Sequence, residues 1–327
     1  MKMKSPLFWN HFGIGAVLLG PAAWAFQGVA GVRNALAAPP WRASIPVVCI
    51  GNLVIGGAGK TPVAIDIARR LLRRGVDAHF LSRGYGGSAR GPLRVDPMIH
   101  SAPLTGDEPL LLANVAPTWV SSDRPAGGRA AIDAEAQVIV MDDGFQNPSL
   151  AKDLSLLVID GGYGLGNGHV FPAGPLRESV SSALSRANAV VIVGEDKTGV
   201  TTRLGEQCEV LRADLVPTQE GDELRGQTVV AFAGIGRPEK FFSTLRKLGC
   251  EIVEAQAFAD HHPYTDAELT QLREAAARTS ARLVTTEKDW VRIAPAAREG
   301  IIHLPVAIRW SDEATIDSHL ETLMAPP

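Results

Sequence analysis

The segment from Ile45 to Arg83 constrains the fold more than any other part of the chain. A short apolar run, Ile45–Ile50, leads into a glycine-rich loop, Gly51–Gly59, which is followed by Lys60-Thr61 and by an amphipathic segment, Pro62–Arg74. A short apolar run is typical of a buried strand, and apolar residues spaced by three and four positions are typical of a helix. This order of strand, glycine loop and helix predicts an α/β unit whose loop binds phosphate.

The glycine loop has the chemistry that a phosphate group requires. Glycines let backbone N–H groups approach an anion closely, and the following helix adds its free N-terminal N–H groups and its dipole. Lys60 would place a positive charge beside the terminal phosphates, and the Thr61 hydroxyl would reach Mg²⁺. The match is imperfect, because Val54 stands where the standard pattern has its first glycine. We predict a nucleotide site, rather than an ordinary glycine-rich turn, formed by Val54, Ile55, Gly56, Gly57, Ala58, Gly59, Lys60 and Thr61.

Length and charge narrow the class of protein. The 327 residues carry a formal net charge of −3 without a long basic run, so no nucleic-acid partner is expected. No motif in the sequence implies an obligatory protein partner. The three cysteines, Cys49, Cys208 and Cys250, have neither metal-ligand spacing nor an even number for disulfides, which fits a reducing compartment. The length predicts two α/β units, residues 43–225 and a smaller one at 226–327, after an N-terminal segment of residues 1–42.

The N-terminal segment is apolar enough to meet a membrane. Its part from Phe12 to Val32 carries no formal charge, and its length is near the ~20 residues that cross a bilayer. Gly20-Pro21 and Gln27 interrupt the run, so a helix lying in the membrane interface competes with a spanning helix and with a buried helical hairpin. A secretory signal peptide would have similar charges, but a nucleotide site follows directly and ATP is cytosolic. We predict a membrane-associated helix on a cytoplasmic enzyme.

The rest of the chain alternates apolar runs with helical stretches, which predicts a parallel sheet with helices on both faces. The fold class is therefore α/β, with a phosphate-loop NTPase-like core and a smaller C-terminal α/β domain. Core strands are expected at Val47–Ile50, Ala78–Leu81, Thr118–Val120, Val138–Met141, Leu156–Ile159 and Ala189–Val193. Strands of the smaller domain are expected at Val229–Ala233, Glu251–Ala257, Arg282–Thr285 and Ile301–Val306.

Acidic and histidine clusters supply further candidate sites. Asp142-Asp143 ends an apolar run, and a carboxylate at the end of a strand beside a phosphate loop can hold Mg²⁺. Asp107-Glu108 precedes a leucine-rich stretch, where acidic residues can simply favour a helix N-terminus. The cluster Asp260-His261-His262 is compatible with a metal site, an acid/base pair or a solvated loop. Adjacent histidines point in different directions, which disfavours one shared metal.

An ordered set of motifs gives nearly the whole chain a resemblance to one family. Each motif is weak alone, but the set in this order is specific. The chain resembles tetraacyldisaccharide 4′-kinase, the lipid A biosynthesis kinase of Gram-negative bacteria. The motifs are Gly51-Asn52 through Thr61-Pro62, Ser82-Arg83-Gly84-Tyr85-Gly86, Gly106-Asp107-Glu108-Pro109, Asp142-Asp143-Gly144-Phe145-Gln146, Pro172-Ala173-Gly174-Pro175-Leu176-Arg177-Glu178, Phe258 to His261, and Thr285-Thr286-Glu287-Lys288-Asp289.

The resemblance implies a reaction and roles for individual residues. The γ-phosphate of ATP would pass to the 4′-hydroxyl of tetraacyldisaccharide 1-phosphate, giving lipid IVA at the cytoplasmic face of the inner membrane. Asp107 is implied as the general base and His261 as its partner, in a cleft between the two domains. Mg²⁺ would be held near Asp142, Asp143, Thr61 and Gln146. Arg83 and Arg177 are additional candidates for phosphate contacts.

Two other classes of protein remain open. One is a phosphate-loop GTPase or ATPase switch, or a metallochaperone-type NTPase. A GTPase normally has an Asn/Thr-Lys-x-Asp motif that reads the base, and Thr286-Glu287-Lys288-Asp289 lacks that spacing. The other is a membrane-bound binding module with a degenerate nucleotide site, which would not consume ATP when the acylated disaccharide is added.

Overall fold

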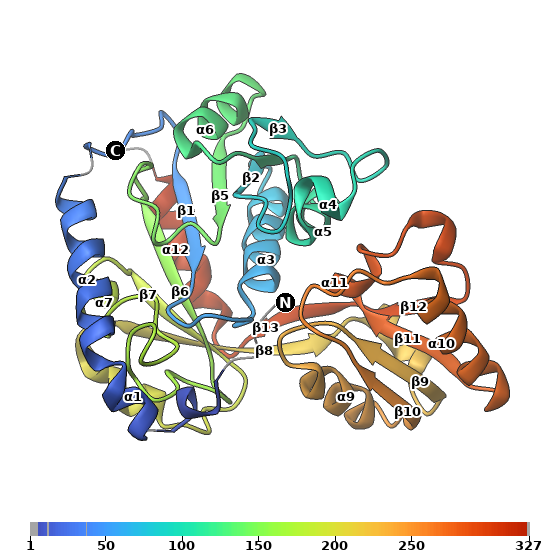
Figure 1. The fold of residues 1–327 in the computed structure, drawn as a ribbon. Coiled ribbons are helices and arrows are strands. Elements are labelled where there is room, and N and C mark those ends of the chain that lie inside the picture. The colour runs from blue at the N-terminus through green and yellow to red at the C-terminus, as the bar shows by residue number, and fades with distance from the viewer. Residues whose placement is uncertain (1–5, 12, 37, 326–327) are drawn as a thin grey trace.

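A computed structural model describes residues 6–11, 13–36 and 38–325, and its strands form two sheets (Figure 1). The larger sheet has nine strands in the order β13-β8-β7-β6-β1-β5-β2-β4-β3, and the smaller has four in the order β10-β9-β11-β12. In the larger sheet β3 pairs antiparallel with β4 and β13 pairs antiparallel with β8, whereas the pairs of the smaller sheet, β10 with β9, β9 with β11 and β11 with β12, are parallel. A parallel α/β core beside a smaller parallel sheet confirms the α/β part of the predicted fold class, and the membrane association of the N-terminal helix stays a prediction.

The strands of the larger sheet lie close to the predicted positions. They are β1 (Val47–Gly51), β2 (Ala78–Ser82), β3 (Leu93–Arg94), β4 (Thr118–Val120), β5 (Val138–Asp142), β6 (Leu154–Asp160), β7 (Ala189–Val193), β8 (Glu209–Pro217) and β13 (Val306–Trp310). The smaller sheet contains β9 (Thr228–Ala233), β10 (Glu251–Ala257), β11 (Arg282–Thr286) and β12 (Ile301–Leu304). All ten predicted strands have a counterpart, and β3, β8 and β13 were not predicted as separate strands.

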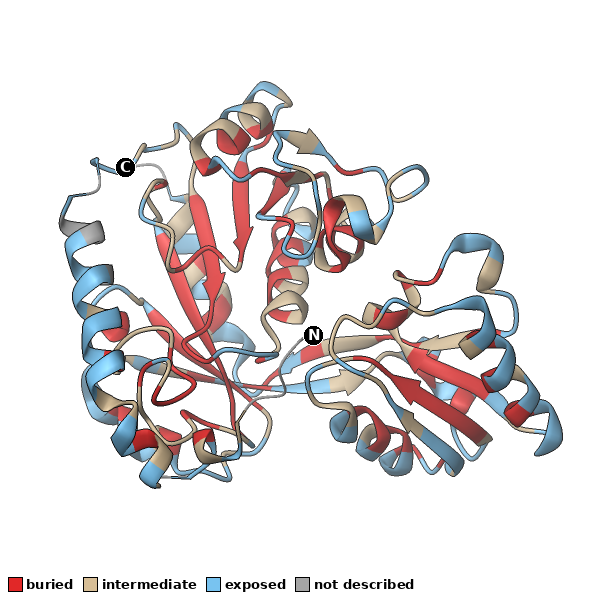
Figure 2. Cartoon of the chain, in the orientation of Figure 1, coloured by how far each residue is buried: buried red, intermediate tan, exposed pale blue. Residues whose placement is uncertain are grey.

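Helices cover both faces of the larger sheet, as Figure 2 shows by the buried strands at its centre. One face packs against α3 and α12, through Ile67, Leu71, Ile316 and Leu320. The other face packs against the loop after β5 and the short helices α7 and α8. In the smaller sheet α9 and α10 cover opposite faces. The longer helices are α2 (Gly20–Ala35), α3 (Lys60–Arg73), α5 (Asp107–Ala113), α6 (Arg124–Asp133), α9 (Pro238–Lys247), α10 (Asp266–Arg278) and α12 (Glu313–Met324). The short ones are α1 (Ile14–Leu18), α4 (Ala102–Thr105), α7 (Val180–Leu184), α8 (Val200–Leu204) and α11 (Glu287–Trp290).

The C-terminal part of the chain divides differently from the prediction. We expected one strand at Ile301–Val306, but the run splits at Pro305 into β12 and β13, which belong to different sheets. A proline lacks the N–H that a continuous strand would need at this position. After Pro305 the chain returns to the larger sheet, where β13 pairs with β8 and α12 packs beneath it. The predicted unit 226–327 therefore gives its last strand and helix to the larger sheet.

We call the part of the molecule built on the nine-stranded sheet the larger unit and the part built on the four-stranded sheet the smaller unit. The N-terminal helices lie along the outside of the larger unit (Figure 1). The helix breaks at Leu19, directly before Gly20-Pro21, as the sequence predicted. Gln27, the second residue that interrupts the apolar run, lies inside α2, where its side chain donates to the Ala23 carbonyl. Phe12, the start of the predicted apolar run, lies outside the described residues. Among the residues that the structure describes, none of the helices combines the length and the apolar character needed to cross a bilayer.

Candidate active site

The glycine loop connects the buried end of β1 to the N-terminus of α3. Gly51 lies against Phe145, where a Cβ would collide with that side chain. The Asn52 side chain donates to the carbonyls of Val54 (2.6 Å) and Gly56 (3.2 Å), which fixes the curve of the loop. Val54 pairs with Leu176 in an isolated antiparallel bridge. The position of the missing first glycine is therefore held by backbone pairing with another loop, and the loop reaches the helix N-terminus in the way a phosphate site requires.

The residues predicted to hold Mg²⁺ meet at the C-terminal edge of the sheet. β1 and β5 are neighbouring parallel strands, so Asp142 ends beside the glycine loop. The Thr61 hydroxyl donates to Asp142 Oδ2 over 3.0 Å, whereas the buried Asp142 Oδ1 has no hydrogen-bond partner. The Lys60 ammonium lies 3.7 Å from Asp143 Oδ1. Hydroxyl and carboxylate oxygens with one unsatisfied buried atom are a suitable donor set for a hard divalent cation.

Gln146, in the loop after β5, and Arg177, in the loop after β6, support this corner. Arg177 donates to both carboxylate oxygens of Asp143, over 2.8 and 3.2 Å, and to Gln146 Oε1 over 3.2 Å. Gln146 in turn donates to the Asn52 carbonyl. Asp143 has a φ of 54°, a left-handed conformation that is uncommon outside glycine and often marks functional positions. The two loops are therefore bound to each other through the predicted metal residues.

The two adjacent aspartates have opposite pKa shifts. Burial raises the pKa of Asp142 to about 7, although the Lys60 charge opposes this change. Burial acts on Asp143 in the same direction, but Lys60 and Arg177 outweigh it and hold the pKa of Asp143 below its usual range. Burial also lowers the pKa of Lys60. A second positive charge beside Asp142, such as a bound cation, would favour its ionised form.

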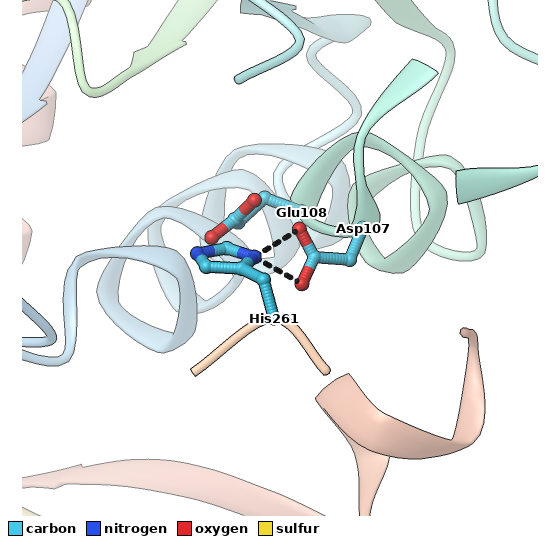
Figure 3. A group of neighbouring side chains, drawn as sticks. All are labelled: Asp107, Glu108 and His261. Carbon is cyan, nitrogen blue, oxygen red and sulfur yellow. Dashed lines mark hydrogen bonds and ion pairs between the residues drawn. The ribbon is translucent and has the colours of Figure 1, made fainter. Parts of the chain in front are cut away.

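The two residues of the predicted catalytic pair come from different units and lie in contact. Asp107 begins α5 in the larger unit, and His261 lies in the loop after β10 of the smaller one, with a φ of 57°. The His261 Nδ1 lies 2.9 Å from Asp107 Oδ2 and 3.1 Å from Oδ1, as Figure 3 shows. The Tyr85 ring contacts the imidazole, with 5.8 Å between the ring centroids. The predicted catalytic pair therefore forms only where the two units meet.

Two cations from the smaller unit balance the two carboxylates at the start of α5. Lys288 pairs with Glu108 over 2.6 Å, and the Arg292 guanidinium donates to Asp107 Oδ2 over 2.6 Å. Burial alone would raise the pKa of Asp107, but the His261 hydrogen bond and the Lys288 and Arg292 charges hold it far below its usual range. Possible metal-ligating atoms of Asp107, Glu108 and His261 lie within 4.8 Å of one another. Since lysine and arginine already neutralise these carboxylates, we interpret the group as an acid/base site rather than a metal site.

One cavity of about 2510 Å³ joins the glycine loop, the aspartate pair and the histidine. Every predicted site residue lines it except Val54, which is buried under the loop, and Asp107, which is 3% exposed and lies behind Glu108 and His261. Arg83 and Arg177 are both on its wall. The residues predicted to bind phosphate and the histidine of the predicted base therefore share one solvent-accessible space, which transfer of a phosphoryl group to a hydroxyl would require.

Sequence reasoning missed Arg124 and Arg292 and left His262 without a role. Arg124 is 2% exposed, lines the cavity and has a buried Nε without a hydrogen-bond partner. Arg292 contacts Asp107 across 185 positions of sequence, so no local pattern could reveal it. His262 points to α10, where it bonds to Glu268 over 2.9 Å. Its ring also stacks on Phe258. His262 therefore stabilises the loop that carries His261.

Comparison with known proteins assigns the family. Residues 15–325 match the family model described as tetraacyldisaccharide-1-P 4′-kinase, LpxK. The tetraacyldisaccharide 4′-kinase of Rhodospirillum centenum is 52% identical, covering 99% of this chain and 97% of the relative, and that of Rhodospirillum rubrum is 49% identical, covering 98% of each. A crystal structure of the "apo" form of LpxK from Aquifex aeolicus in complex with ATP superposes with a TM-score of 0.77 at 25% identity, covering 95% of this chain and 99% of that one. The chain described here belongs to the tetraacyldisaccharide-1-P 4′-kinase family.

Proposed function

We propose that this protein transfers the γ-phosphate of ATP to the 4′-hydroxyl of tetraacyldisaccharide 1-phosphate, forming lipid IVA in lipid A biosynthesis. The observation that carries this proposal is the cavity lined both by the glycine loop and by His261, whose Nδ1 contacts Asp107 behind it. Family membership supports a kinase over an NTPase switch or a binding module without catalysis. The predicted division into an N-terminal segment, a core and a smaller domain serves the reaction, because the nucleotide residues and His261 come from different units.

The nucleotide residues would act by holding and neutralising phosphate. The backbone N–H groups of the loop and of the α3 N-terminus would bind the phosphate oxygens, and Lys60 would offset the charge that develops during transfer. The Thr61 hydroxyl and the free Asp142 Oδ1 would hold Mg²⁺, with Asp143 and Gln146 beside them. Mg²⁺, when bound, supplies charge neutralisation to the phosphates. Arg177 anchors Asp143 and keeps this corner closed.

Asp107 and His261 would act together as the general base. The 4′-hydroxyl is a poor nucleophile at neutral pH, and a positioned base contributes about 10²–10⁴-fold to the rate. The imidazole lines the cavity, whereas the carboxylate lies behind it and accepts its hydrogen bond. The proton of the hydroxyl passes to this pair as the oxygen attacks phosphorus. The exposed Arg83 and the buried Arg124 on the same wall are suitable partners for the phosphate of the acceptor.

The N-terminal helices would hold the enzyme on the membrane that contains its acceptor. Apolar side chains on α1 and α2 are strongly exposed, among them Ile14 (79%), Leu18 (74%), Trp24 (75%) and Val29 (70%). Helices that expose such residues bind in the interfacial region of a bilayer. On the opposite side Ala16 and Ala23 are buried against the protein. This surface, together with the use of ATP, supports a location at the cytoplasmic face of the inner membrane.

The direct test is the reaction itself. Purified protein is incubated with ATP, Mg²⁺ and tetraacyldisaccharide 1-phosphate in detergent, and the lipid is analysed by mass spectrometry. One added phosphate on the non-reducing sugar is expected. The acceptor lacking a free 4′-hydroxyl serves as the control, and phosphate transfer to that control would place the acceptor position elsewhere. ATP consumption that does not depend on the lipid would favour the NTPase alternative.

A further inference from the structure

Arg292 lies between the two units and contacts the proposed base directly. Its Nε donates to Asp107 Oδ2 over 2.6 Å, and its Nη2 donates to the same oxygen. Its Nη1 donates to Asp289 Oδ1 over 2.8 Å and to the Gly234 carbonyl over 2.7 Å. The side chain is 5% exposed. All three guanidinium nitrogens are therefore engaged, so the position of the group is fixed in the structure.

The residue that anchors Arg292 is itself held by several donors. Asp289 has no solvent exposure, and its Oδ1 accepts hydrogen bonds from the Gly234 N–H (3.0 Å) and the Tyr264 hydroxyl (2.8 Å). Its Oδ2 accepts from the Thr286 hydroxyl over 2.6 Å. Such a network locks both the plane and the direction of the guanidinium. The smaller unit thus presents a rigid pair of N–H groups to the Asp107 carboxylate.

The contact has a consequence for His261. A carboxylate that receives two N–H groups on one oxygen stays ionised and acts only as an acceptor. The His261 Nδ1, which lies 2.9 Å from Asp107 Oδ2, must then donate. In the neutral imidazole this leaves Nε2 with its lone pair, and Nε2 is the ring nitrogen able to accept a proton. Arg292 therefore fixes the orientation of the carboxylate, and the carboxylate in turn fixes the tautomer of the histidine.

We infer that Arg292 is a positioning residue for phosphoryl transfer, which holds Asp107 and His261 in the arrangement that accepts the proton of the acceptor hydroxyl. The inference rests on the proposed base role of Asp107 and His261. Arg292 touches neither ATP-binding residue Lys60 nor Thr61, so its removal should lower kcat and leave ATP binding nearly unchanged. A residue that serves only folding would not separate these two quantities.

The test compares Arg292→Ala with a control, Arg298→Ala. Arg298 stacks on the Trp290 ring and donates to the Ile293 carbonyl in the same part of the smaller unit, and no contact to Asp107 is recorded for it. We expect Arg292→Ala to lower kcat about 10²-fold, the size of effect that a misplaced catalytic group produces, and to change KM for ATP less than ~3-fold. Guanidinium ion at constant ionic strength should enter the vacated space and restore kcat at least ~10-fold. The control should keep its kcat and show no response to guanidinium.

Further variants decide the remaining outcomes. Arg292→Lys keeps a charge but not the planar fork, so we expect kcat to stay at least ~10-fold below that of the unchanged enzyme. A normal kcat in Arg292→Ala or Arg292→Lys would overturn the inference, as would a failure of guanidinium to restore kcat in an Arg292→Ala protein that binds ATP normally. If Arg292→Ala does not fold, the Arg292→Lys result decides alone. Normal turnover in Asp107→Ala would instead refute the proposed base, whatever Arg292 does.

Discussion

Replacing Asp142 with asparagine should stabilise the protein at high pH while it removes activity. Asp142 is buried beside the glycine loop, and one of its oxygens has no hydrogen-bond partner. Burial raises its pKa from the usual 3.8 to about 7. Because a pKa difference of 1 corresponds to about 1.36 kcal/mol, ionising this group in the folded protein destabilises it by about 4 kcal/mol.

The sign of the pH dependence follows from the direction of the shift. The folded-state pKa lies above the unfolded value, so the stabilising contribution is fully present below the unfolded pKa of 3.8 and is lost as pH rises through about 7. About 2–3 kcal/mol of this loss falls between about pH 5 and about pH 8. The asparagine side chain of the variant cannot ionise. The free energy of unfolding of Asp142→Asn minus that of the unchanged protein should therefore grow by about 2–3 kcal/mol over this interval.

The assay is urea unfolding followed by tryptophan fluorescence, with EDTA present to remove divalent cations. Taking the difference between the two proteins at each pH cancels the titration of all groups that they share. Asp214→Asn removes an exposed carboxylate of β8 and serves as the control for loss of a negative charge. A difference that stays constant within ~0.5 kcal/mol between the two pH values would refute the reasoning, because a buried carboxylate with a raised pKa must show this dependence. Mg²⁺ should then stabilise the unchanged protein more than the variant.

Three further predictions concern the nucleotide site, the base and the membrane surface. Asp107→Ala and His261→Ala should each lower kcat by about 10²–10⁴-fold. Because the two residues act as a unit, the double variant should lose no more kcat than the poorer single variant. A loss in the double variant equal to the product of the two single losses would show that they act independently. Lys60→Ala should lower kcat/KM for ATP by about 10²-fold or more, so unchanged ATP kinetics would contradict the assignment of the loop. Leu18→Asp combined with Trp24→Asp should reduce sedimentation with lipid vesicles while activity in detergent persists, and a variant that still sediments fully must use another surface.

The strands at the centre of the larger sheet could be predicted because their environment is simple. β1, β5, β6 and β7 are buried along their whole length, so apolar residues dominate them, with Ser155 and the terminal Asp142 and Asp160 as exceptions. β8 alternates buried Leu211 and Ala213 with exposed charged residues, so its sequence contains no apolar run that would predict a strand. β13 was joined to β12 because the apolar pattern continues across Pro305, and only the three-dimensional arrangement assigns the two strands to different sheets.

In the site, too, contacts that follow from the order of neighbouring strands could be predicted, whereas contacts between the two units could not. The contact between Thr61 and Asp142 could be foreseen, because the C-terminal ends of neighbouring parallel strands lie at one edge of a sheet. Asp107 and His261 were paired by resemblance, and their contact in the structure agrees with that pairing without testing their catalytic role. Arg292 had no signal in the sequence. Its partners depend on how the two units dock, and docking is a property of surfaces that no periodicity describes.

The return of the chain to the larger sheet after Pro305 has a consequence for synthesis on the ribosome. Trp310, Ile316 and Leu320 belong to the hydrophobic core that also contains α3. The Trp310 indole N–H donates to Asp66, and Arg70 pairs with Asp317. A nascent chain that has emerged only through β8 therefore has an open sheet edge and an uncovered helix. The larger sheet of this kinase therefore cannot be completed until residues 306–324 have been translated, although the glycine loop of the same sheet is translated much earlier.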